Sequence, residues 1–199
     1  AGGMGRLVLL GGPAGIGKTR LAEELEREAS AIGIPVVWGR CLDDDGAPPL
    51  WPWLRLLAAA GAEPAAVEEA LSAVADGALE AAAARFRLVD AVTRAVIGVA
   101  APAGLVAVLE DLQWADETSL RVLRHVAGEV AGSRLLLLTT YRDPAGLDEF
   151  PGPVAETLAD VARQRRIGQL HLTPFGETAV AAFLHGMIGR PVPAGLAHA

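Results

Sequence analysis

Residues 6–20 read RLVLLGGPAGIGKTR, and this stretch decides the fold. Residues 7–10 form a continuous apolar run, which predicts a short buried strand. Residues 11–17 are rich in glycine, and leucines then recur at helical spacing. The order is therefore strand, loop, helix, and residues 12–19 satisfy the Gly-x-x-x-x-Gly-Lys-Thr pattern of a phosphate-binding loop in the required context.

The spacing of this loop suits a triphosphate. Backbone N–H groups must turn inward around the phosphate oxygens, so residues without a Cβ are needed where the chain curls. The helix that follows points its positive end at the same anion. The Lys18 ammonium can reach the β and γ phosphates, and the Thr19 hydroxyl is a hard oxygen ligand suited to Mg²⁺. We therefore predict that ATP and Mg²⁺ bind here. The predicted nucleotide-binding residues are Gly12, Pro13, Ala14, Gly15, Ile16, Gly17, Lys18, Thr19 and Arg20.

A pair of acids forms the second part of the predicted site. Residues 105–109 read as a central strand covered on both faces, and Glu110 and Asp111 follow directly. One carboxylate can hold the metal or its waters while the other orients or deprotonates an attacking water. We assign Glu110, with Thr19, to the metal and Asp111 to the water, and the register of these two roles stays open by one residue. The alternative is that both acids merely end a strand.

The third part follows the next apolar run, residues 135–138. The guanidinium of Arg142 is always charged and can contact the γ phosphate, so that it reports hydrolysis. Thr139 or Thr140 can offer a hydroxyl to the same oxygens. The alternative is that Arg142 only pairs with Asp143 at the surface. The predicted catalytic residues are thus Lys18, Glu110, Asp111 and Arg142.

Strands and helices alternate along the whole chain. This order predicts an α/β fold, a three-layer α/β/α sandwich of the P-loop NTPase type around a mainly parallel five-stranded sheet. The remaining strands are expected at 34–38 and 167–172. Helices are expected at 18–31, 51–57, 119–130 with Thr118 as cap, 176–187, and across the Ala-rich residues 63–99 with breaks at Pro64, Gly77 and Gly98. Ligands of such sheets bind beyond the carboxyl ends of the strands, so all three parts of the site should lie along one rim.

The composition argues against several classes of function for this chain. Of the 199 residues 52% are apolar and 21% charged, which indicates a globular chain. The net charge of −7 argues against this segment itself gripping nucleic acid. The longest uncharged run is shorter than the ~20 residues of a membrane span, and no leader is visible. Cys41 is the single cysteine, which excludes an internal disulfide, and we expect a cytoplasmic protein.

Four stretches together resemble a known family. They are GGPAGIGKTRLAEEL (11–25), VVWGRCLDDDGAPPLWPWLRLL (36–57), VLEDLQWADETSLRVLRHVA (108–127) and LLLLTTYRD (135–143). They look like the ATPase module of the large ATP-binding regulators of the LuxR type, within the STAND class of AAA-related signalling ATPases. Similar modules accompany bacterial adenylate cyclase and kinase domains. The resemblance implies ATP binding at Gly12, Gly17, Lys18 and Thr19, Mg²⁺ and hydrolysis functions at Glu110 and Asp111, and a phosphate sensor at Arg142.

The resemblance also implies a domain organisation and a function. We expect residues 1–168 to form the ATPase core, N-terminally truncated because the family's adenine-holding segment is missing, and residues 169–199 to form the last strand and an incomplete helical lid. The expected function is an ATP-driven switch that hydrolyses slowly, self-associates through this domain, and acts on transcription and DNA through domains outside this chain. Alternatives are a small-molecule kinase, with Arg163, Arg165 and Arg166 as a cationic lid, and a nucleotide-binding scaffold that does not hydrolyse ATP.

Overall fold

The computed structural model describes residues 4–43, 47–62, 65–75, 81–142 and 152–188, and its centre is a parallel sheet. Five strands pair in the order β2-β3-β4-β1-β5. The predicted α/β class with a parallel five-stranded sheet is thus confirmed. The strands are β1 (Arg6–Gly11), β2 (Val36–Arg40), β3 (Leu105–Glu110), β4 (Leu135–Thr140) and β5 (Ile167–His171).

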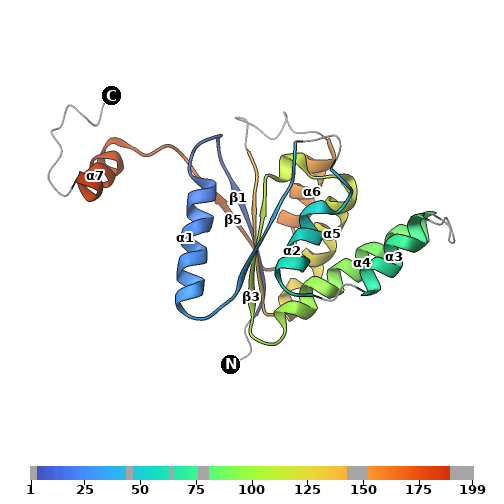
Figure 1. Ribbon diagram of the computed structural model, residues 1–199. Coiled ribbons are helices and arrows are strands. Elements are labelled where there is room, and N and C mark those ends of the chain that lie inside the picture. The colour runs from blue at the N-terminus through green and yellow to red at the C-terminus, as the bar shows by residue number, and fades with distance from the viewer. Residues whose placement is uncertain (1–3, 44–46, 63–64, 76–80, 143–151, 189–199) are drawn as a thin grey trace.

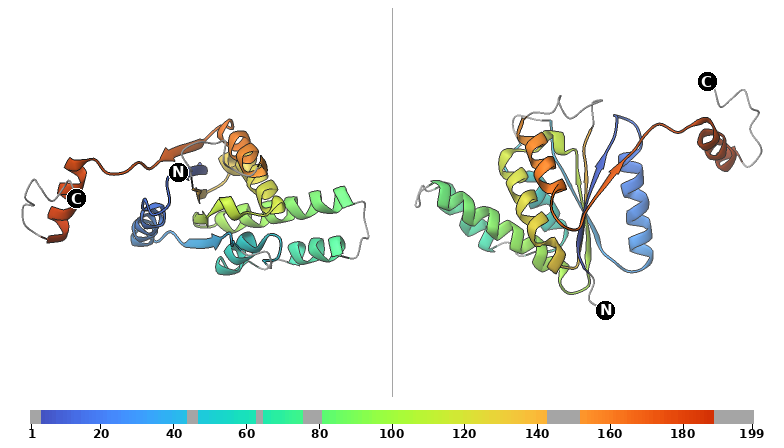
Figure 2. Two further views of the ribbon diagram at one scale, coloured as in Figure 1. Left: turned by 90° about the horizontal axis from the view of Figure 1, so that it is seen from above. Right: turned by 180° about the vertical axis from the view of Figure 1, so that it is seen from behind.

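The helices cover the two faces of the sheet unequally. They are α1 (Lys18–Ala31), α2 (Trp51–Ala59), α3 (Ala65–Ala75), α4 (Ala81–Ala100), α5 (Glu117–Glu129), α6 (Gly152–Ala162) and α7 (Glu177–Ile188). Among the described helices, α1 alone packs on one face, while α2, α4, α5 and α6 gather on the other (Figures 1 and 2). Every residue of β3 is buried, as expected for a strand covered on both sides.

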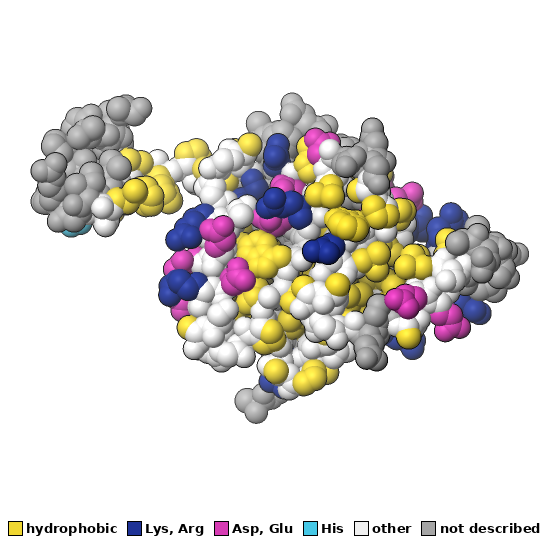
Figure 3. Space-filling model, viewed as in Figure 1, with side chains coloured by type: hydrophobic (Ala, Val, Ile, Leu, Met, Phe, Trp, Pro, Cys, Tyr) yellow, Lys and Arg dark blue, Asp and Glu magenta, His cyan; other side chains and the backbone are white. Residues whose placement is uncertain are grey.

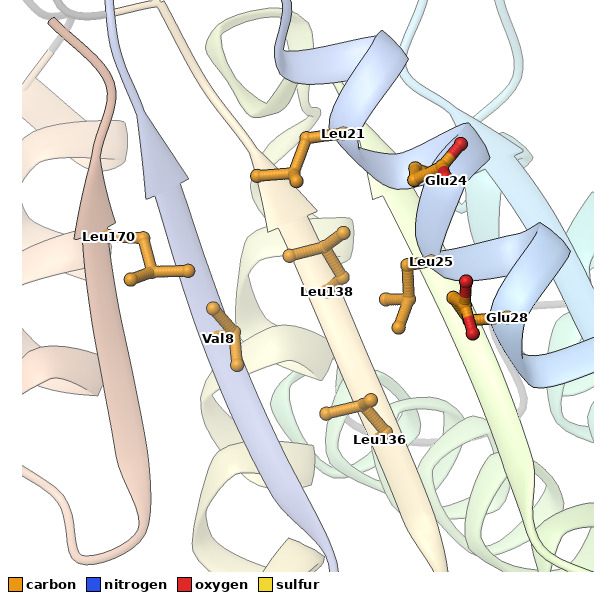
Figure 4. Close-up of a pocket in the computed structure, with 8 residues that line it drawn as sticks. All are labelled: Val8, Leu21, Glu24, Leu25, Glu28, Leu136, Leu138 and Leu170. Atoms are coloured by element: carbon orange, nitrogen blue, oxygen red, sulfur yellow. The ribbon is translucent and has the colours of Figure 1, made fainter.

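The face under α1 keeps an open apolar groove of about 380 Å³ (Figure 4). Aliphatic side chains from α1, β1, β4 and β5 line it, with two glutamates on the α1 side. They are Val8, Leu21, Leu25, Leu136, Leu138 and Leu170, with Glu24 and Glu28. Helix α7 stands apart from the sheet at the end of an extended link (Figure 1). Apolar side chains lie on its surface (Figure 3). Phe183 and Met187 of this helix are both exposed.

The opposite face is fixed by Trp53 of α2, which is fully buried. Its indole Nε1 donates a hydrogen bond to the carbonyl oxygen of Ser119 in α5 at 3.1 Å. The Asp116 carboxylate accepts hydrogen bonds from the backbone N–H groups of Ser119 and Leu50 and from the Ser119 hydroxyl. The expected cap Thr118 was therefore wrong by two residues, because Asp116 reaches the free N–H groups at the start of α5.

Several other boundaries differ from expectation by one or two residues, and two differences have a clear physical reason. Helix α4 runs through Gly98 to Ala100, because buried Val92 and Val96 hold it against the core, and packing offsets the cost of an internal glycine. Strand β2 begins two residues later than predicted, since Val36 is the first residue in register with β3. The expected breaks at Pro64 and Gly77 lie outside the described residues. In the described part of the chain, none of the helices has the length and apolar character needed to cross a membrane.

Candidate nucleotide site

The loop between β1 and α1 has the backbone shape that a phosphate needs. Gly12, Gly15 and Gly17 all have positive φ angles, of 150°, 75° and 106°. A residue with a Cβ would be strained at these angles. Space is also tight at Gly12, where a Cβ would lie 2.8 Å from the carbonyl oxygen of Leu172, just beyond β5. The loop is thus curled and leads directly into the N-terminus of α1, a 14-residue helix.

Lys18 lies inside the curl of the loop. The residue is 8% exposed, and its ammonium donates hydrogen bonds to the carbonyl oxygens of Gly12 at 2.7 Å and Pro13 at 2.8 Å. Burial lowers the pKa of Lys18, nearby Asp111 opposes this shift, and Arg142 adds to it. The ammonium therefore lies near both the acid and the arginine that the sequence places in the site.

Thr19 and Glu110 are 91 positions apart in the sequence but are in contact in the structure. The Thr19 hydroxyl donates a hydrogen bond of 2.7 Å to Oε1 of Glu110. Glu110 is the last residue of β3 and is only 3% exposed. A hydroxyl and a carboxylate in contact beside a phosphate loop are the hard oxygen ligands that Mg²⁺ prefers. The residues present therefore fit the predicted metal.

Asp111 is held in an unusual backbone conformation, with φ 61° and ψ 49°. Its backbone N–H donates to the Thr140 hydroxyl at 3.1 Å, and its Oδ1 accepts a hydrogen bond of 2.9 Å from Gln113. A left-handed conformation at a residue with a side chain is sparsely populated and persists where neighbours hold it. Thr140 thus holds the backbone of Asp111, and Gln113 holds its carboxylate, at the end of β3.

Arg142 joins the same rim through Gln113. The Gln113 side-chain oxygen accepts a hydrogen bond of 3.1 Å from the Arg142 backbone N–H, so one amide side chain connects Asp111 to the segment after β4. The Thr139 hydroxyl donates into the sheet, to the carbonyl oxygen of Val8 at 3.2 Å. Thr139 therefore has a role within the sheet. Asp143, the alternative partner of Arg142, lies outside the described residues.

The other predicted loop residues fall into two groups. Pro13 and Ala14 are exposed on the outer surface of the loop and Ile16 is half-buried, so their contribution is through the backbone. The Arg20 side chain lies on the outer surface of α1, where it pairs with Glu23 at 3.1 Å. It does not join the hydrogen bonds that link Lys18, Thr19 and Glu110.

The basic cluster considered as a kinase lid lies at the opposite end of the sheet. Arg166 comes just before β5, and its carbonyl oxygen accepts a hydrogen bond from the backbone N–H of Leu7 at the start of β1. Arg163 pairs with Asp160 of α6. In a parallel sheet the amino ends of the strands lie opposite the phosphate loop, so these arginines cannot cover it.

Sequence reasoning missed Arg40 as a site residue. Arg40 ends β2 and stands opposite Glu110 in the parallel register. Its guanidinium donates two hydrogen bonds to Oε2 of Glu110, from Nε at 3.0 Å and Nη2 at 2.5 Å, and this contact raises the pKa of Arg40. Gln113 was also missed. The contact of Arg40 with Glu110 and that of Gln113 with Arg142 join residues 70 and 29 positions apart, and no local sequence pattern predicts them.

Comparison with known families agrees with this geometry. The model of the AAA ATPase domain matches residues 1–138, more than half of the chain, so the chain belongs to the AAA ATPase domain family. No curated protein sequence matches the chain significantly.

The chain is similar to solved structures at low sequence identity, and one with a TM-score above 0.5 shows the same fold. The Walker-type ATPase paby2304 of Pyrococcus abyssi has a TM-score of 0.52 at 13% identity, with 96% of this chain and 56% of that chain covered. A STAND protein with a tetratricopeptide repeat sensor, PH0952 of Pyrococcus horikoshii, has a TM-score of 0.48 at 15% identity, with 98% of this chain and 25% of that chain covered. The Aeropyrum pernix Orc1 protein in complex with DNA has a TM-score of 0.41 at 17% identity, with 92% of this chain and 44% of that chain covered. The chain thus spans between a quarter and rather more than half of these proteins.

Proposed function

We propose that this chain is the ATP-binding, slowly hydrolysing switch domain of a signal-responsive transcriptional regulator. Membership of the AAA ATPase domain family supports nucleotide binding. The resemblance of four stretches to LuxR-type regulators supports the finer proposal. In this proposal residues 1–168 are the ATPase core, and residues 169–199 are the last strand and the start of an incomplete helical lid.

The observation that carries the proposal is the contact between Thr19 and Glu110. It brings the phosphate loop and the end of β3 within 2.7 Å, although β4 lies between β1 and β3 in the sheet. Such a contact places oxygen ligands beside the phosphates of a nucleotide held by the loop. A Gly-rich turn that only joined a strand to a helix would not need it.

Each group of the site has a distinct task in ATP hydrolysis. The loop N–H groups and Lys18 bind the phosphates, and Thr19 and Glu110 hold Mg²⁺. When bound, Mg²⁺ neutralises charge that develops on the phosphate oxygens. Asp111 accepts the proton of the attacking water or orients it. Thr140 holds the Asp111 backbone, and Gln113 holds its carboxylate. Arg142 contacts the γ phosphate and responds when it is lost.

The switch acts by differential binding. ATP and ADP must bind two arrangements of the domain with different affinity, because a ligand shifts an equilibrium only by that difference. We propose that the ATP form self-associates through this domain and that DNA is contacted by domains outside this chain. The net charge of −7 supports the second point.

A phosphate-release assay tests the proposal. The wild type and Lys18→Ala are incubated with γ-labelled ATP and Mg²⁺, with and without added metabolites, and sedimentation is compared in Mg·ATP and Mg·ADP. We expect slow phosphate release without an acceptor, lost in the variant, and larger assemblies in ATP. Tight binding without release would favour a scaffold instead, and label transfer to a metabolite would favour a kinase.

A further inference from the structure

Glu110 has both carboxylate oxygens engaged in this structure. Oε1 accepts the hydrogen bond from Thr19, and Oε2 accepts both hydrogen bonds from Arg40. An ionised carboxylate binds a metal through the same lone pairs that accept hydrogen bonds. A divalent ion at Thr19 and Glu110 therefore meets a carboxylate that already has a cationic partner.

The partner is positioned by the fold. Arg40 and Glu110 are paired residues of neighbouring parallel strands, so their side chains leave the sheet on the same side. Gly39 lets α2 pack directly on β2 next to this pair, because a Cβ there would lie 2.2 Å from the carbonyl oxygen of Pro52. The backbone N–H of Cys41 donates to the carbonyl oxygen of Glu110 at 2.9 Å and extends the pairing past β2. The contact is thus held from both strands.

The two side chains differ in their surroundings. The Glu110 side chain is 4% exposed, whereas that of Arg40 is 58% exposed. Next to Arg40 is an open cavity of about 330 Å³, lined also by Trp38, Trp51 and Arg55. Figure 3 shows Lys and Arg side chains beside hydrophobic ones on this face of the molecule. The guanidinium can therefore swing into this cavity or into water without disturbing the core, whereas the carboxylate cannot leave.

We infer that Arg40 is an internal counter-cation of Glu110 that Mg²⁺ has to displace, so that Arg40 sets how strongly nucleotide binding depends on the metal. This inference rests on the proposed function of the same site. Arg40 and a bound divalent ion both carry positive charge and share one buried carboxylate, so each weakens the binding of the other. The equilibrium coupling is reciprocal, and a bound metal therefore frees the Arg40 guanidinium at the exposed edge of β2.

The test compares ADP binding in Mg²⁺ and in EDTA by calorimetry on the full chain. The variants are Arg40→Gln, which removes the charge, and Arg55→Gln as matched control. Arg55 lines the same cavity but stacks on Trp51. We expect the ratio of the two ADP affinities to rise about fivefold or more in Arg40→Gln and to stay at the wild-type value in Arg55→Gln. An unchanged or smaller ratio in Arg40→Gln overturns the inference.

Two further variants separate this role from a merely structural one. Arg40→Lys keeps the charge and is expected to hold the ratio closer to wild type, which keeps the inference testable if Arg40→Gln folds poorly. Adding Arg40→Gln to Glu110→Gln should not raise the ratio, because the effect passes through the Glu110 carboxylate. A rise in that double variant contradicts the inference.

If the wild type binds ADP and Lys18→Ala does not, but Arg40 has no effect on the ratio, only this inference fails. If the wild type binds no nucleotide at all, the proposed function fails with it.

Discussion

The two halves of the nucleotide site are built in different ways. The phosphate-loop half, residues 12–19, is one continuous segment whose shape comes from glycine backbone angles. The acid half consists of Arg40, Glu110, Asp111, Gln113 and Arg142, which come from three strand ends and a short turn. The first half depends on local sequence, whereas the second depends on the whole fold. Mutations should therefore separate the two halves.

The largest effect is expected from a residue that touches no part of the site. Trp53→Ala removes a fully buried side chain and its hydrogen bond to α5, and should lower the free energy of unfolding by about 3–5 kcal/mol. Urea denaturation followed by circular dichroism measures this change. Trp51→Ala on the same helix is the control, since Trp51 is only half-buried and its contact with Arg55 is worth about 1 kcal/mol or less. If both variants lose the same free energy of unfolding, Trp53 does not hold α2 against α5.

The next effect tests the phosphate-loop half. Lys18→Ala removes an ammonium that can contact two phosphates, and each such charged hydrogen bond contributes about 1.5–3 kcal/mol. We expect ADP affinity to fall about 100-fold or more by calorimetry. Arg27→Ala is the control, because Arg27 only pairs with glutamates on the exposed side of α1. If Lys18→Ala binds ADP with wild-type affinity, the loop is not the binding site.

Asp111→Asn probes the acid half without disturbing the backbone. Asparagine tolerates the left-handed conformation of residue 111 and can keep the hydrogen bond to Gln113. We expect phosphate release to fall about 100-fold, the lower end of the usual contribution of a general base, with ADP affinity nearly unchanged. A variant that hydrolyses ATP at the wild-type rate would transfer the water-activating role to Glu110, the register left open by the sequence.

The smallest effect concerns the connection inside the acid half. Gln113→Ala removes one bond to Asp111 and one to the Arg142 backbone, each worth about 1 kcal/mol. Phosphate release should fall about fivefold, with ADP affinity preserved. Gln169→Ala on the exposed edge strand β5 provides the matched control. If both variants behave like the wild type, Asp111 is positioned by Thr140 alone.

The contrast between the halves also explains what the sequence can predict. The loop and its helix follow from glycine placement and apolar spacing, and the structure has β1 and α1 where they were expected. The positions of Glu110 and Asp111 at the end of β3 and of Arg142 after β4 were also predictable, because apolar runs mark where strands end.

The contacts within the acid half were not predictable. Arg40 faces Glu110 only because β2 pairs with β3 in one particular register. The same holds for Asp116, which caps α5 and also binds the backbone of Leu50, 66 residues away. Contacts of this kind depend on sheet order and helix packing, which no local spacing encodes.

The close approach of Gly12 and Leu172 has a consequence for how the molecule can change shape. Leu172 is joined to β1 by a hydrogen bond from its backbone N–H to the carbonyl oxygen of Gly11, and its own carbonyl oxygen leaves no space for a side chain at residue 12. Five residues later the chain enters α7. If the loop tightens around an anion, the tether of the last described helix has to shift with it. The phosphate loop and the segment that leads to α7 are therefore in direct contact, at the end of the pairing between β1 and β5.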